Sequence, residues 1–189
     1  MRYLTPQYYM ADPSAHVFNG RLYIYPSHDR ESGVPQNDNG DHFNMKDYHV
    51  FSMDDVENGE VIDHGVILDV KDIPWAGRQL WDCEVACKNN KYYMYFPLKD
   101  KNDIFRTGVA VADKPEGPFI PQSDPMRGSY SMDYCVLEEK GEFYFYFGGL
   151  WGGQLQRYKD NKALESGGTY PADDEPAIAP RVAKHGFAV

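Results

Sequence analysis

One short pattern occurs three times in this chain and constrains its fold more than any other feature. In each copy an aspartate precedes a short apolar run, a tight turn and a second run rich in alternating aromatic residues. The turns align on Gly20, Asn90 and Gly141. Eight residues before each turn lies an aspartate: Asp12, Asp82 and Asp133. Turn residues between alternating apolar runs are a strong hairpin signal, so the sequence predicts three β-hairpins, repeated after 70 and then 51 residues.

Further strands are predicted at about 47–52, 62–68 and 105–112, so each unit holds roughly four short antiparallel strands. The fold class is therefore all-β, and a repeat of this length is typical of a β-propeller. We expect blades at about 10–68, 80–125 and 130–183, in one partial propeller domain over residues 1–189. A propeller usually needs four or more blades to close, so about three blades leave an open face that a second copy of the chain could cover.

Composition excludes several classes of partner. The net charge is −10 and no basic run occurs, which argues against binding to nucleic acid or to an anionic membrane surface. No apolar stretch reaches 18 residues, and the first residues lack the apolar core of a signal peptide, so we expect a cytoplasmic protein. The three cysteines, Cys83, Cys87 and Cys135, are expected to be reduced, packed thiols.

The repeated aspartates are the first candidates for chemistry. In a propeller the innermost strand of each blade lines the central channel, so Asp12, either Asp82 or Glu84, and Asp133 are expected to meet in one funnel. Converging carboxylates repel one another and suit general acid and base catalysis. The alternative is that each aspartate only caps a turn, but the shared repeat offset favours a common site.

Aromatic and polar residues near these positions could bind a sugar. Trp81 lies beside the acidic position, and Trp151 lies between two Gly pairs that would let a ligand approach the backbone. His28 and Asp29 end the first hairpin and could bond to substrate hydroxyls. His28 could equally be an interior histidine whose partners are protein groups.

Three segments resemble the blades of glycoside hydrolase family 43, the five-bladed propeller β-xylosidases and α-L-arabinofuranosidases, and the resemblance extends to about residue 183. The segments are ADPSAHVFNGRLYIYPSHD, LWDCEVACKNNKYYMYFP and SYSMDYCVLEEKGEFYFYFGG. The resemblance implies that Asp12 is the general base, and that Asp133 orients the general acid and tunes its pKa. Trp81 and Glu84 match the second motif, in which Asp82 and Cys83 replace the family's Ala-Pro. Tyr134 replaces the Pro of the third motif.

The resemblance also implies the reaction, which is inverting hydrolysis of O-glycosidic bonds in xylose- or arabinose-containing hemicellulose. The family's general acid is a glutamate that opens a fourth blade, and the chain contains no match for it. No cofactor is expected, apart from a calcium ion that family members often hold on the propeller axis. Two alternatives remain: a truncated propeller fragment that binds carbohydrate without catalysis, and a fragment that serves only as an interaction platform.

Overall fold

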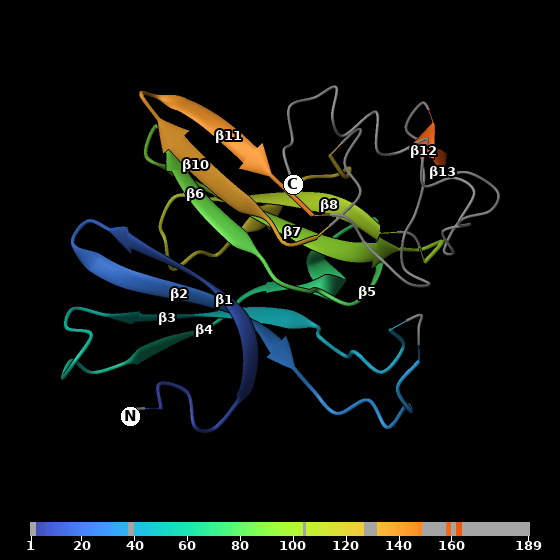
Figure 1. The fold of residues 1–189 in the computed structure, drawn as a ribbon, viewed down its shortest axis with the longest axis horizontal. Helices are drawn as coiled ribbons and strands as arrows, with labels where there is room; N and C mark the ends of the chain where they lie inside the picture. The colour runs from blue at the N-terminus through green and yellow to red at the C-terminus, as the bar shows by residue number, and fades with distance from the viewer. Residues whose placement is uncertain are drawn as a thin grey trace.

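Two antiparallel sheets and a third hairpin form the fold (Figure 1). The computed structural model describes residues 3–37, 40–103, 105–126 and 132–148, together with the strand residues 158–159 and 162–163. The first sheet has the order β1-β2-β3-β4. Its strands are β1 (Tyr9–Phe18), β2 (Arg21–Asp29), β3 (Asp47–Met53) and β4 (Ile62–Asp69).

The second sheet is built around the long strand β7 (Lys91–Asp100). On one side β7 pairs with β8 (Phe105–Ala112), which pairs with β9 (Ile120–Pro121). On the other side its first half pairs with β6 (Glu84–Lys88) and its last residues pair with β5 (Ala76–Arg78). A short 3-10 turn, η1 (Val70–Asp72), precedes β5.

The third hairpin pairs β10 (Cys135–Glu139) with β11 (Glu142–Tyr146). A separate pair of two-residue strands, β12 (Tyr158–Lys159) and β13 (Lys162–Ala163), follows it. In Figure 1 the third hairpin lies beside β6 at the top of the second sheet, while β1 and β2 lie on the other side of β6. The innermost strands of the three units are therefore neighbours.

All three predicted hairpins turn through two residues, and both turn residues have positive φ. This is the geometry that matches the right-handed twist of paired strands. The turn residues are Asn19 and Gly20 (φ 54° and 80°), Asn89 and Asn90 (52° and 58°), and Lys140 and Gly141 (54° and 82°). Asn and Gly tolerate this left-handed region better than other residues, which is why the turns were readable in the sequence.

One continuous core joins the first two sheets. Its fully buried members include Tyr25 and Tyr48 from the first sheet and Met94, Phe96 and Leu98 from β7. The Tyr25 hydroxyl donates to the Pro115 carbonyl (2.8 Å), which satisfies its one polar group inside the core. Buried and less buried positions alternate along the first half of β7, as expected for a sheet packed on one face, whereas residues 96–99 are all buried.

The prediction of an all-β fold is confirmed, with two local differences. The sequence predicts no element between the strand at about 62–68 and the second hairpin, but residues 69–81 contain η1 and β5. The cysteines are all free, but only Cys83 is buried; Cys87 is half-buried, and Cys135, the first residue of β10, is exposed. The expectation of packed thiols is therefore wrong for Cys135.

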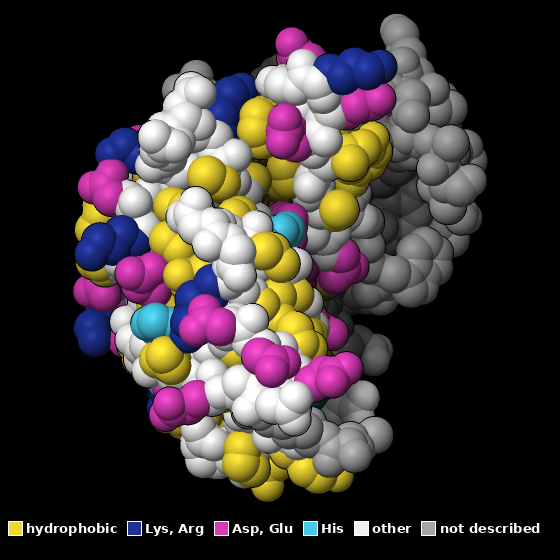
Figure 2. Space-filling view, turned by 90° about the vertical axis from the view of Figure 1, so that its left-hand side faces the viewer, with side chains coloured by type: hydrophobic (Ala, Val, Ile, Leu, Met, Phe, Trp, Pro, Cys, Tyr) yellow, Lys and Arg dark blue, Asp and Glu magenta, His cyan; other side chains and the backbone are white. Residues whose placement is uncertain are grey.

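The surface mixes charged and apolar side chains. Figure 2 shows hydrophobic side chains lying between acidic and basic ones on one face of the molecule. On the third hairpin Leu137, Tyr144 and Tyr146 are 44–48% exposed. In the part of the chain that the structure describes, no helix has the length and apolar character needed to cross a membrane.

Candidate active site

Asp12 and Asp133 occupy equivalent positions in two hairpins and share an unusual backbone. Asp12 has φ 44° and lies where the pairing of β1 with β2 is interrupted between Ala11 and Ser14. Asp133 has φ 59° and lies two residues before β10 begins. Residues with a side chain seldom adopt this left-handed region, and such strain is concentrated at functional positions. Both carboxylates therefore lie in the same left-handed geometry, two residues before the regular pairing of their hairpins begins at Ser14 and Cys135.

The electrostatics of four carboxyl groups show that the hairpins bring them together. Partial burial raises the pKa of Asp133, and the negative charge of Asp12 raises it further. Burial also raises the pKa of Asp29, with a further contribution from Asp12, while His28 acts in the opposite direction. For Asp82, burial first, then the charges of Asp133 and Asp12, raise the pKa to about 6. The predicted convergence of the repeated aspartates thus extends to Asp29.

Glu84 lies in the second hairpin and is held by groups from the first and the third. It is only 6% exposed. The Ser14 hydroxyl donates to Oε2 (2.7 Å), His16 Nε2 lies 3.2 Å from Oε1, and the Val136 N–H donates to Oε1 at 3.4 Å. Ser14, Glu84 and Cys135 are equivalent residues, because each begins the regular pairing of its hairpin opposite a tyrosine. Glu84 therefore joins the three inner strands, and both of its oxygens are engaged.

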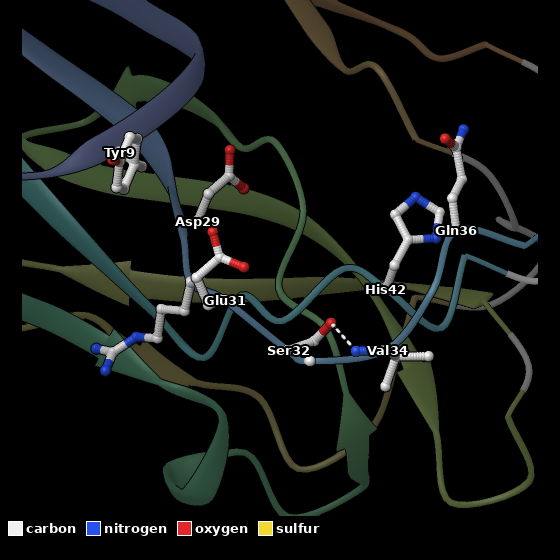
Figure 3. Close-up of a pocket in the computed structure, with 9 residues that line it drawn as sticks. Tyr9, Asp29, Glu31, Ser32, Val34, Gln36 and His42 are labelled. Carbon is white, nitrogen blue, oxygen red and sulfur yellow. Dashed lines mark hydrogen bonds between the residues drawn. The ribbon is translucent and has the colours of Figure 1, made fainter.

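Of the four aspartates, Asp29 lines a hollow in the surface (Figure 3). The hollow has a volume of about 440 Å³ and is formed by the end of β2, the loop that follows it and the start of β1. Figure 3 shows Tyr9, Asp29 and Glu31 on one side and His42 and Gln36 on the other. Such a mixture of one aromatic ring with several polar groups is suited to a polar ligand such as a sugar.

His28 lies in a buried network on the first sheet. Its Nδ1 is 2.5 Å from Asp47 Oδ1, and Arg30 pairs with the other oxygen of Asp47. His49 approaches Asp47 through Nε2 (3.8 Å) and Asp63 through Nδ1 (3.1 Å). Of the two alternatives for His28, this arrangement corresponds to the interior histidine with protein partners, since the residue is 8% exposed and its ring is bonded to Asp47.

The same network contains the metal-ligand cluster found among the described residues. Ligand atoms of His28, Asp47 and His49 lie within 4.8 Å of one another. Calcium binds six to eight oxygen atoms, so two imidazoles and one carboxylate do not fit it. A transition metal would suit the donors better, but the Arg30 guanidinium already neutralises Asp47. We therefore interpret the cluster as an ionic network that orders the end of β2.

The two tryptophans differ in what the structure shows. Trp81 is half-buried, with its ring packed against Phe43 (centroids 4.4 Å apart) and Phe105 (5.7 Å). Its indole Nε1 is buried and has no hydrogen-bond partner among the described residues. Trp151 lies outside the described residues. Stacking of a sugar on either ring therefore stays a prediction.

Sequence reasoning did not resolve the separate tasks of Asp82 and Glu84. Glu84 bonds to groups of the first and the third hairpin and so joins the inner strands. The Asp82 carboxylate instead accepts hydrogen bonds from the backbone N–H groups of Asp133 and Tyr134. The repeat offset identified Asp82 as a candidate. No signal in the sequence identified Ser14, His16 or the amide of Val136 as partners of Glu84.

Comparison with known proteins agrees with this geometry. The family model of Glycosyl hydrolases family 43 matches residues 5–174. A xylosidase/arabinosidase from Bacteroides ovatus is 70% identical over 184 residues, which cover 97% of this chain and 56% of that protein. Xylosidase/arabinosidase 43A from Humicola insolens is 56% identical over 188 residues, covering 96% and 58%. The chain thus spans little more than half the length of these relatives.

Two solved structures extend the comparison to the fold. RS223-β-xylosidase superposes with a TM-score of 0.81 and 75% identity, over 88% of this chain and 52% of that one. CoXyl43, a β-xylosidase/α-arabinofuranosidase from a compost microbial metagenome, was solved with xylotriose in a calcium-free form; its TM-score is 0.82 at 58% identity, over 92% and 53%. The prediction of part of a five-bladed propeller is confirmed. With a family model that spans most of its length and relatives of such high identity, the chain belongs to glycosyl hydrolase family 43.

Proposed function

We propose that the protein hydrolyses O-glycosidic bonds in xylose- or arabinose-containing hemicellulose, with inversion at the anomeric carbon. The observation that carries the proposal is the pair formed by Asp12 and Asp133, two aspartates in matching left-handed conformations whose charges interact across two hairpins. The names of the relatives, xylosidase/arabinosidase and β-xylosidase, support the substrate class.

In the proposed mechanism Asp12 is the general base. Its exposed carboxylate takes a proton from a water molecule as the water oxygen attacks the anomeric carbon. The glycosidic oxygen leaves with a proton from a general acid on the opposite face of the sugar. Inverting enzymes hold their two carboxyl groups ~6.5–9.5 Å apart to make room for that water. One water molecule is consumed for each glycosidic bond that is cleaved, and the reaction needs no redox cofactor.

Asp133 would orient the general acid and raise its pKa through its negative charge, so that the acid keeps its proton at neutral pH. The acid itself is proposed to be a glutamate outside the described residues. Glu84 is unsuited to that task, because Ser14, His16 and Val136 engage its two oxygens. The hollow beside Asp29 would receive hydroxyl groups of the substrate.

Calcium has no step in this proposal. The buried cluster around Asp47 has the wrong donors for calcium, and an axial calcium ion stays a prediction that rests on the family resemblance.

The test is hydrolysis of aryl β-xylosides and α-L-arabinofuranosides by the chain and by its Asp12→Asn variant. We expect release of the aryl group by the wild type and a loss of at least 100-fold in the variant, with unchanged melting temperature. An Asp72→Asn variant, which changes an exposed aspartate in η1, is the matched control. Undiminished turnover in Asp12→Asn would refute the assignment of the base.

A second function, carbohydrate binding without hydrolysis, is favoured by one observation: Glu84, the glutamate nearest the repeated aspartates in sequence, is buried and both of its oxygens are engaged. Calorimetric titration with xylo- and arabino-oligosaccharides separates the two. Binding without turnover in the wild-type chain supports this second function, whereas turnover that depends on Asp12 excludes it.

A further inference from the structure

We propose that Asp82 is a positioning residue that holds the backbone at Asp133 from the neighbouring sheet. The clamp consists of two hydrogen bonds, from the N–H groups of Asp133 and Tyr134 to the Asp82 carboxylate. Its structural part follows from contacts within the described chain. Its catalytic consequence rests on the proposed function, because it concerns the aspartate that is to orient the general acid.

The segment that carries Asp82 is itself fixed on both sides. The Trp81 N–H donates to the Pro97 carbonyl of β7 (3.2 Å), and the Trp81 carbonyl accepts a hydrogen bond from a tyrosine of β3. The next residue, Cys83, is buried and directs its thiol toward the Tyr25 carbonyl of β2 (3.7 Å). Asp82 therefore extends from a backbone that is anchored to both sheets of the core, which restricts the movement of its carboxylate.

The backbone N–H groups that donate to the Asp82 carboxylate are arranged to bind an anion. A left-handed residue such as Asp133 (φ 59°) directs successive N–H groups toward the same side, which forms a small anion-binding nest. The flanks are tied down by other bonds: the Gly148 N–H donates to the Met132 carbonyl (2.9 Å), and the Tyr134 hydroxyl bonds to Thr107 of β8 (2.7 Å). The two hydrogen bonds to Asp82 hold the backbone that lies between these two anchored residues.

Comparison with the first hairpin shows why the third needs such a clamp. Asp12 has the same left-handed backbone, but β1 is paired with β2 on both sides of it, at Ala11 and again at Ser14. In the third hairpin regular pairing begins at Cys135, and before Asp133 the two strands are joined by the bond from the Gly148 N–H to the Met132 carbonyl. The backbone at Asp133 is therefore held by less strand pairing than the backbone at Asp12, and the side chain of Asp82 adds two hydrogen bonds to it.

Two variants separate the clamp from a role in packing alone. Asp82→Asn keeps an oxygen acceptor of similar shape but removes the charge, while Asp82→Ala removes the acceptor. Asp124→Asn, at an exposed aspartate whose carboxylate bonds to Ser123, is the matched control. All three are measured in the 189-residue chain by amide hydrogen exchange and by NMR titration of amide chemical shifts.

The clamp predicts exchange about tenfold faster at Asp133 and Tyr134 in Asp82→Ala, with Asp82→Asn close to wild type and the control unchanged. It also predicts that both amide protons shift with pH in the wild type with a midpoint near 6, the pKa of Asp82, and that Asp82→Asn removes this midpoint. A midpoint that persists in Asp82→Asn, or equal exchange in all variants, overturns the proposal.

Turnover provides a separate readout. If the chain hydrolyses aryl glycosides, Asp82→Ala should lower kcat about tenfold or more and shift the pH profile, with KM little changed, because the sugar contacts remain. Amide shifts that follow Asp82 without any hydrolysis support the clamp and count against the proposed function. Hydrolysis with a pH profile that is identical in all three variants counts against the clamp alone.

Discussion

The pH dependence of stability in Asp82→Asn tests the electrostatics of the carboxylate cluster. Burial and the charges of Asp133 and Asp12 raise the pKa of Asp82 from its ordinary 3.8 to about 6. Such a rise corresponds to roughly 3 kcal/mol of differential stability. Because the folded state binds the proton more tightly than the unfolded state, this contribution is fully present below about pH 4 and is lost as the pH rises through 6. Ionised Asp82 therefore destabilises the folded chain at pH 8.

Asparagine is neutral at every pH and keeps one oxygen to accept the backbone N–H groups. Asp82→Asn should therefore raise the free energy of unfolding at pH 8 by up to ~3 kcal/mol and leave it nearly unchanged at pH 4. Urea denaturation of both proteins at pH 4 and pH 8 measures the two differences, with Asp124→Asn as the control. An equal effect at both pH values, or a loss of stability at pH 8, would refute the reasoning.

Three further predictions follow from packing. Gly108→Ala places a Cβ atom 2.1 Å from the buried ring of Phe96, so chemical denaturation should show a loss of ~1–3 kcal/mol. Glu84→Ala leaves its partners on two other hairpins without an acceptor and should cost ~2–3 kcal/mol, whereas Glu84→Gln should cost less; equal losses would contradict the bonding described. A thiol reagent should label Cys135 in the folded chain and Cys83 only on unfolding, as mass spectrometry can show.

Much of the fold was predictable because its signals are local. The hairpin turns at Asn19-Gly20 and Asn89-Asn90 need residues that accept positive φ, and the sequence provides them at a fixed distance from an aspartate. Alternating residues then give the strands on each side. By contrast, β5 (Ala76–Arg78) has only three residues and owes its strand geometry to pairing with the end of β7, so no local pattern marks it.

The candidate site could be predicted from the sequence only at the positions that recur in the repeat. The offset common to Asp12, Asp82 and Asp133 indicated that they converge, and the structure brings them within electrostatic reach of one another. The offset could not distinguish Asp82, which reaches the amides of Asp133 and Tyr134, from Glu84, which joins the inner strands. That distinction depends on side-chain directions and on contacts between blades, and these are set by packing across residues far apart in the sequence.

The stereochemistry of hydrolysis tests the central claim most directly, because it reports whether water attacks with the help of Asp12. The hydrolysis of an aryl β-xyloside can be followed by proton NMR at early times, before the anomers of free xylose equilibrate. The account predicts that α-xylose appears first in the wild type and that Asp12→Asn releases no sugar above background. Initial release of β-xylose, or α-xylose formed at the same rate by Asp12→Asn, would contradict it.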